Sequence, residues 1–127
     1  MISKGIRVKR DRLAKVECGV NWCDDADFDE ENMPGAGPGG DVNLFGWFVV
    51  GTTVGGNGIV VREDDPGVYF ASHEGYTSDS VFIEGGDPEY VELNAENVRR
   101  SLRRLAATIE EFVADPEAME SQIDDID

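Results

Sequence analysis

The sequence predicts an α+β fold in which an antiparallel sheet of about four to six strands packs against a C-terminal amphipathic helix. Short runs rich in Val, Ile, Phe and Tyr alternate with Gly, Asn, Asp and Pro between residues 43 and 84. From Val98 to Val113 the apolar residues recur instead at steps of three and four. The 127 residues, 40% of them hydrophobic, suit a single core, so we expect residues 1–127 to form one domain.

Residues 1–41 form a basic arm followed by a polar loop. The first 17 residues carry six Lys or Arg against two acidic residues, which leaves a charge of −20 on the other 110. We expect this arm to fold back onto the acidic body. Its apolar residues are irregularly spaced and predict only a weak strand or two. Residues 24–40 predict a loop, because acidic residues give way to a run of Gly and Pro.

Four apolar runs predict strands at residues 44–50, 59–62, 68–71 and 81–84. The connections between them are short, and none has the helical pattern that a parallel crossover requires. The four strands are therefore expected to form an antiparallel meander.

The C-terminal third predicts one continuous helix. Asn94 is a suitable N-cap, and Pro116 follows its expected end. Residues 116–127 are acidic with little apolar surface, so we expect this tail to fray. A basic cluster lies on one side of the expected helix and should pair with the acidic body: Arg99, Arg100, Arg103 and Arg104.

The composition excludes several function classes. A net charge of −16 opposes docking on nucleic acid or anionic lipid, both of which need clustered Lys and Arg. The longest uninterrupted apolar run has four residues, 47–50, and the start of the chain lacks the apolar segment of a signal peptide. We therefore expect a cytoplasmic protein with no membrane partner. Cys18 and Cys23 could form a disulfide, although a reducing compartment gives little reason for one.

Three motifs resemble ligand sites but fail in detail. Residues 35–40 match G-x-G-x-x-G without a strand before or a helix after. The turn 51–58 resembles a phosphate-binding loop, but Asn57 stands where lysine is required. The alternation of Asp25, Asp27 and Asp29 suggests calcium, but Glu30 replaces the glycine of such a loop. With a single histidine the chain also cannot build a structural zinc site, so no cofactor and no metal are expected.

His73-Glu74 is the only place where a catalytic base can be imagined. Adjacent residues on a strand point to opposite faces, and no positioned nucleophile can be named. We therefore expect no enzyme and no catalytic residue. Trp22 and Trp47 suit core packing better than a binding platform.

The order of these features resembles the SUKH superfamily. The resemblance rests on the strand at 45–50, the Gly-rich turn 55–58 before the strand 59–61, the strand 68–70 leading to His73-Glu74, and the helical pattern 105–113. It implies an α+β fold and, for most bacterial members, an immunity protein that neutralises a toxin, often a nuclease, delivered between competing cells. Other members resemble interaction modules of cell-wall or signalling pathways. Family members usually start with a helix followed by a Leu-Pro pair and an Asn-Gly-Gly segment, and residues 1–41 show neither.

The expected function is therefore non-enzymatic binding of a protein partner, with a basic toxin domain as the specific partner. An acidic inhibitor gains association rate by electrostatic steering toward a basic nuclease cleft. We expect contacts from exposed residues around the Gly-rich turn and strand ends, with an aromatic anchor: Trp47, Asn57, Asp64, Asp65, His73, Glu74 and Tyr76. The acidic run is a second candidate surface: Asp24, Asp25, Asp27, Asp29, Glu30 and Glu31.

Three alternatives stay open. A regulatory module of the same fold would bind an endogenous partner, and an enzyme would use a pocket that the sequence does not reveal. All three lysines lie in the N-terminal arm. A lysine-poor acidic body also arises by adaptation to high salt, which would explain the charge without a basic partner. The oligomeric state is not specified by these patterns.

Overall fold

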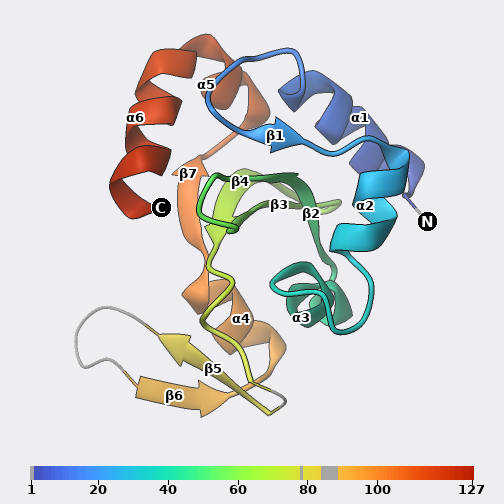
Figure 1. Cartoon of the computed structure of the whole chain (residues 1–127), viewed down its shortest axis with the longest axis vertical. Helices are drawn as coiled ribbons and strands as arrows, with labels where there is room; N and C mark the ends of the chain where they lie inside the picture. Colours follow the sequence, from blue (N-terminus) through green and yellow to red (C-terminus); the bar gives the residue numbers. More distant parts are fainter. Residues whose placement is uncertain (1, 78, 84–88) are drawn as a thin grey trace.

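Five antiparallel strands form the central sheet in a computed structural model of the chain, which describes residues 2–77, 79–83 and 89–127 (Figure 1). The strand order is β1-β2-β3-β4-β7. The middle three strands are the predicted meander, because short turns join them in sequence order. The predicted α+β class is confirmed. The five strands are β1 (Asn21–Trp22), β2 (Trp47–Thr52), β3 (Gly58–Arg62), β4 (Asp65–Ala71) and β7 (Arg103–Ala106).

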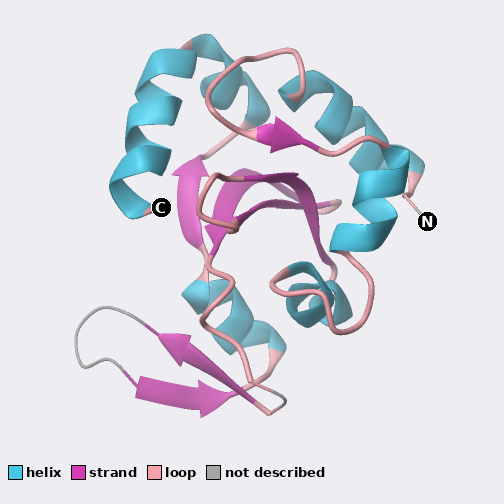
Figure 2. Ribbon diagram, viewed as in Figure 1, coloured by secondary structure: helices cyan, strands magenta, loops and turns pink. Residues whose placement is uncertain are grey.

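The fourth predicted strand does not join this sheet. It forms β5 (Ser80–Ile83), which pairs with β6 (Glu89–Glu92) in a separate two-stranded sheet. This β5–β6 hairpin projects from the body beside helix α4 (Ala95–Ser101), as Figure 2 shows. Residue 84, the end of the predicted strand, lies outside the described residues. The place beside β4 is taken by β7, so the prediction of a four-stranded meander is wrong at this point.

The prediction of a single continuous C-terminal helix is also wrong. Helix α4 ends before Leu102, whose extended backbone (ψ 134°) leads into β7, and helix α5 (Ile109–Ala114) begins only after Thr108. Asn94 caps α4 as predicted, accepting a hydrogen bond from the N–H of Asn97 at 2.9 Å. The apolar residues at steps of three and four are nevertheless buried, except for the half-buried Val113, and they are distributed over one strand and two short helices. Such a stripe marks burial but does not exclude an interruption by a strand.

The acidic tail is a helix, contrary to the predicted fraying. Helix α6 (Pro116–Ile126) begins at Pro116 and is capped by Asp115, whose carboxylate accepts from the N–H of Ala118 at 3.1 Å. Proline therefore starts this helix instead of marking the end of the previous one. Met119 and Ile123, one turn apart, are buried and hold α6 against the body.

The N-terminal arm is a helix as well, where weak strands were expected. Helix α1 (Lys4–Leu13) buries Ile6, Arg10 and Leu13, which stand at positions i, i+4 and i+7. The helical stripe was obscured because an arginine stem fills its middle position. The predicted folding back of the arm is confirmed: Arg12 pairs with Glu110, and Lys9 Nζ donates to backbone carbonyls on the β3–β4 turn.

Residues 24–40 contain two helices where a loop was expected. Helix α2 (Asp25–Glu31) is capped by Asp24 and buries Phe28, and the short helix α3 (Gly39–Val42) runs into the 3-10 turn η1 (Asn43–Phe45). Aspartates are poor helix formers but good caps, so an Asp-rich run can begin a short helix. Residues 34–38 of the Gly and Pro run lie between α2 and α3, and there the loop prediction is correct, whereas Gly39 and Gly40 begin α3.

Helices cover both faces of the sheet. Residues 58–61 of β3 are buried without the alternation that a half-exposed strand would show. Helix α1 contacts β3 and helix α5 contacts β4. Helices α2 and α3 contact β2, and α6 contacts β7 (Figure 1). The hydrophobic core is continuous through these layers, whereas the buried Val81 and Ile83 of the β5–β6 hairpin lie outside it and the hairpin packs against α4.

Candidate partner-binding surfaces and pocket

The structure separates the predicted contact residues into two groups. Gly58 pairs with Ala71 at one end of the β3–β4 hairpin, and Arg62 pairs with Asp65 at the other. Asn57 and His73 therefore lie at the first end and Asp64 at the second. The length of β3 alone separates the two groups by about 13 Å. The predicted residues therefore form two separate groups at opposite ends of this hairpin, not one cluster.

Trp47 is not available as an anchor. Its side chain is 2% exposed and lies edge-on to Tyr69, with 5.0 Å between ring centroids. The guanidinium of Arg62 covers the Trp47 ring at 5.8 Å. The strand that begins at Trp47 turns this residue inward, and the expected aromatic anchor is instead part of the core.

Asp64 and Asp65 both serve the β3–β4 turn. The Asp65 carboxylate accepts from the Gly67 N–H and from the Tyr69 hydroxyl, both at 2.8 Å. Asp64 is paired with Arg62 at 2.6 Å, although its side chain remains 72% exposed. These contacts, together with Lys9 on the turn carbonyls, explain both residues as structural elements of the turn.

Asn57 is a buried link between three parts of the chain. Its Oδ1 accepts from the His73 N–H at 2.9 Å and from His73 Nδ1 at 2.7 Å, and its Nδ2 donates to Asp127 Oδ1 at 2.8 Å. The Asp127 carboxylate also accepts from the Thr53 hydroxyl and from the Gly55 N–H at 3.0 Å. Burial opposes ionisation of Asp127, but these hydrogen bonds outweigh it and lower its pKa. The Gly-rich turn thus holds the end of α6.

His73 and Glu74 do not point apart as expected. Both residues lie beyond the end of β4, in a turn where the alternation of a strand no longer applies. His73 Nε2 lies 3.6 Å from Glu74 Oε1, and the two side chains are 40% and 81% exposed. This pair is an exposed contact at the rim of the pocket described next.

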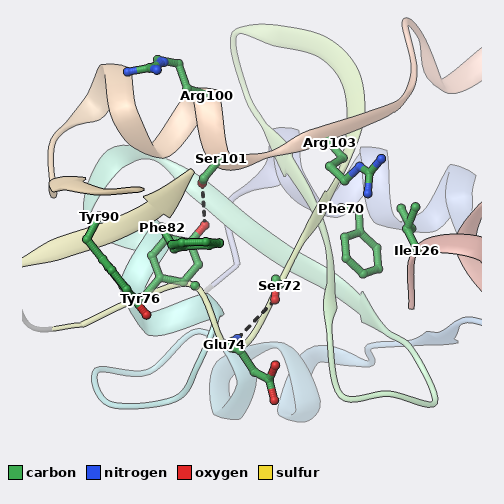
Figure 3. A pocket seen from close by; sticks show the side chains of 11 residues that line it. Phe70, Ser72, Glu74, Tyr76, Phe82, Tyr90, Arg100, Ser101, Arg103 and Ile126 are labelled. Atoms are coloured by element: carbon green, nitrogen blue, oxygen red, sulfur yellow. Dashed lines mark hydrogen bonds between the residues drawn. The ribbon is translucent and has the colours of Figure 1, made fainter. Parts of the chain in front are cut away.

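A pocket of about 520 Å³ lies between the β5–β6 hairpin and the main sheet (Figure 3). Glu74 and Tyr76, which the sequence singled out, both line it. The Tyr76 hydroxyl lies 3.0 Å from Ser101 Oγ, and the rings of Phe82 and Tyr90 are 5.1 Å apart. Sequence reasoning missed most of the other walls, because they come from strands and helices far apart in the chain: Phe70, Phe82, Tyr90, Arg100, Ser101 and Arg103.

Among the described residues, the basic cluster is not paired with the acidic body. Arg99 lies over the Tyr69 ring at 4.4 Å, and Arg100 donates to Asn97 Oδ1 at 3.0 Å. Within residues 2–77, 79–83 and 89–127, none of the ion pairs involves Arg99, Arg100, Arg103 or Arg104. The break between α4 and β7 divides the four arginines between two elements, so they do not form the single helical face that was expected.

The acidic run forms a rigid helical surface. Phe28 buries one side of α2, and the buried Asn32 bonds to both the N–H and the carbonyl of Val49. Asp25 is paired with Arg7 at 3.1 Å and Arg10 at 2.6 Å, and the bond from Arg10 lowers its pKa. Glu31 is half-buried, while the other five acidic residues are exposed.

The carboxylates on and beside α2 affect the pKa of the neighbouring Cys23 thiol. Burial first, and then the carboxylates of Glu31, Asp27 and Asp24, raise the pKa of Cys23 to about 12. Cys18 and Cys23 are both free and buried, so the suggested disulfide is not formed. In the described part of the chain, no group of three His, Cys, Asp or Glu side chains is arranged to hold a metal ion.

No helix within the described residues combines the length and apolar character needed to cross a membrane.

Comparisons with known proteins give no match: no family model, no curated protein and no solved structure matches the chain.

Proposed function

We propose that this protein is a protein-binding domain that presents the acidic surface of α2 to a basic partner. The observation that carries the proposal is the rigid display of exposed carboxylates on a helix fixed to the sheet by Phe28 and Asn32. Asp27 and Glu30 stand three residues apart on α2 and are exposed, so they share one face. A fixed surface of one charge raises the association rate with an oppositely charged cleft.

The specific form that we propose is a cytoplasmic immunity protein that neutralises a basic toxin domain. The α+β architecture and the meander β2-β3-β4 agree with the resemblance to the SUKH superfamily. Helix α1 also supplies the N-terminal helix with which members of that family usually start, while the Leu-Pro pair and the Asn-Gly-Gly segment that follow it in the family are absent from residues 1–41. A nuclease toxin would present a basic cleft shaped for phosphates, and the α2 carboxylates are the chemical complement of such a cleft.

Coexpression with the toxin-like product of a neighbouring gene tests this proposal. We expect restored growth and a stable complex on a sizing column. The combination of no rescue and no complex would refute the immunity role. A complex without rescue would contradict the inhibitory role and leave binding of a protein partner standing.

The pocket favours a second candidate, a regulatory interaction module of the same fold. A module that responds to a signal needs a place for that signal, and the space beside the β5–β6 hairpin is such a place. The two candidates differ in one result: an immunity protein rescues growth whether or not a small ligand is present, whereas a regulatory module changes its partner affinity with the ligand.

A further inference from the structure

The pocket beside the β5–β6 hairpin has aromatic walls. In Figure 3, Tyr76, Phe82 and Tyr90 gather on one side, while Phe70 and Ile126 lie on the other. Phe70 is 3% exposed and Tyr90 is 58% exposed, so the rings grade from a buried floor to an open rim. A volume of about 520 Å³ falls in the range of small-molecule sites, about 300–1,000 Å³.

Three hydroxyl groups of the pocket take part in hydrogen bonds among the described residues: those of Ser72, Tyr76 and Ser101. Ser101 Oγ donates to the Val98 carbonyl at 2.6 Å and lies 3.0 Å from the Tyr76 hydroxyl. Ser72 Oγ accepts from the Glu74 N–H at 3.3 Å. Among the described residues the Ser72 O–H has no acceptor and the Tyr90 hydroxyl has no partner, but both groups are neutral and do not select for a charged ligand.

Arg103 is the charged side chain of the pocket that makes no hydrogen bond or ion pair with the described residues. Its guanidinium lies beside the Phe70 ring in Figure 3, and within the described residues it has no carboxylate in ion-pair distance. Arg100 adds a second positive charge at the pocket, although it donates to Asn97. Glu74 is the only acidic residue among the described lining residues, and its side chain is largely exposed beside His73.

We propose that this pocket binds a small aromatic carboxylate. The ring of the ligand packs among Phe70, Tyr76 and Phe82, and its carboxylate takes two parallel hydrogen bonds from the guanidinium of Arg103. Offset or edge contacts between aromatic rings supply affinity, and the charge-assisted bonds supply the preference for an anion. This inference goes beyond the proposed function, because it requires neither a toxin nor the α2 surface.

The net charge of −16 does not exclude an anionic ligand. At physiological ionic strength the screening length is about 8 Å, so carboxylates on the far side of the molecule act weakly on the pocket. The charges nearest to a bound ligand are those of the described lining residues, which are two arginines and one glutamate.

The test is a titration of the whole protein with naphthoate and with naphthamide, its neutral analogue, followed by amide NMR. We expect the shifts to concentrate at Ser72, Gly75 and Arg103, with naphthoate binding about tenfold more tightly than naphthamide. Arg103→Gln should remove this preference. The matched control is Arg104→Gln on the same strand, which changes the charge equally at a residue that does not line the pocket and should preserve the preference.

Three results would overturn the proposal. They are equal affinity for the two probes, equal effects of the two arginine substitutions, and no pocket shifts with either probe up to about 5 mM. A Phe82→Leu variant provides a second route, because loss of the aromatic wall should weaken both probes while the preference for naphthoate remains. Loss of the preference with binding unchanged would contradict the assigned roles of the wall and the cation.

Discussion

Asn57 Nδ2 donates a 2.8 Å hydrogen bond to the carboxylate of Asp127, seventy residues further along the chain. The same carboxylate accepts from Thr53 and from the Gly55 N–H, so the Gly-rich turn acts as a receptor for the end of α6. Ile126, the preceding residue, lines the aromatic pocket. This contact therefore joins the turn, the last helix and one pocket wall.

Asp127→Asn should lower the free energy of unfolding by about 1 kcal/mol. The new amide places an NH₂ group or a neutral oxygen where the Gly55 N–H and the Thr53 hydroxyl now meet a charged acceptor. The value is at the low end for charge-assisted bonds because Asp127 is exposed. Urea unfolding measures the change. Asp125→Asn on the same helix is the control and should have no effect, because Asp125 makes no hydrogen bond or ion pair with the described residues.

The contribution of Asp127 should also depend on pH in a defined direction. Burial opposes the charge, but the hydrogen bonds prevail and the folded-state pKa is lowered. The stability difference between the wild type and Asp127→Asn is therefore fully present above the unfolded pKa of about 3.9 and is lost as pH falls through the folded pKa. Urea unfolding between about pH 2.5 and 7 measures it. A difference that grew on acidification would show that the carboxylate is not the stabilising form.

Asn32→Ala should cost about 3 kcal/mol of folding stability. The Asn32 amide bonds to the Val49 N–H at 2.8 Å and to the Val49 and Phe28 carbonyls at 2.9 Å, and it is buried. Alanine leaves the Val49 groups in the interior without these partners. Asn21→Ala, at an exposed residue of β1, should change stability by less than about 0.5 kcal/mol. Thermal unfolding of both variants decides, and equal effects would contradict the structural role of Asn32.

Gly39→Ala should prevent α3 from packing where it does. A Cβ at Gly39 would lie 1.8 Å from the Glu31 carbonyl oxygen, a backbone atom that cannot move without shifting α2. We expect a loss of at least about 3 kcal/mol. Gly37→Ala, two residues earlier in the preceding loop, is the control, since its Cβ would meet only ordinary contacts at 3.5 Å or more. Calorimetry should show a large drop in melting temperature for the first variant alone.

The sequence predicted the central strands because their apolar residues are bounded by Gly, Asn and Asp turns. The sequence-based prediction failed where a charged side chain fills a core position and where one apolar pattern runs through several elements. Arg10 fills a core position of α1 with its aliphatic stem, which broke the apolar stripe. The single apolar stripe from Val98 to Phe112 is divided between two helices and a strand. Leu105 and Ala106 lie in β7, which pairs with the edge of β4.

The candidate site was predictable only in part. Glu74 and Tyr76 stood out because they follow a strand, and both line the pocket. Arg103 was recognised as part of a basic cluster, but its aromatic neighbours come from β4, β5 and β6. Their meeting depends on β5 leaving the meander, and no local pattern signals that departure.

The acidic α2 surface was visible in composition, but its form was not. A run of aspartates predicts exposure, which is correct. Its rigidity depends on Asn32 bonding to Val49, a contact across 17 residues that spacing does not indicate.

The association rate with the toxin-like partner tests the central claim about α2 most directly. Two variants carry the same net change in charge at different places: Asp27→Lys with Glu30→Lys on α2, and Glu120→Lys with Asp124→Lys on α6. All four residues are exposed. Helices α2 and α6 lie on opposite sides of the sheet in Figure 1.

Stopped-flow measurement at low salt should show the α2 variant associating at least about tenfold more slowly than the wild type, with the α6 variant within about threefold of it. The difference should shrink as salt is added. Equal slowing by both variants would mean that only the total charge matters, and it would contradict the assignment of α2 as the partner-binding surface.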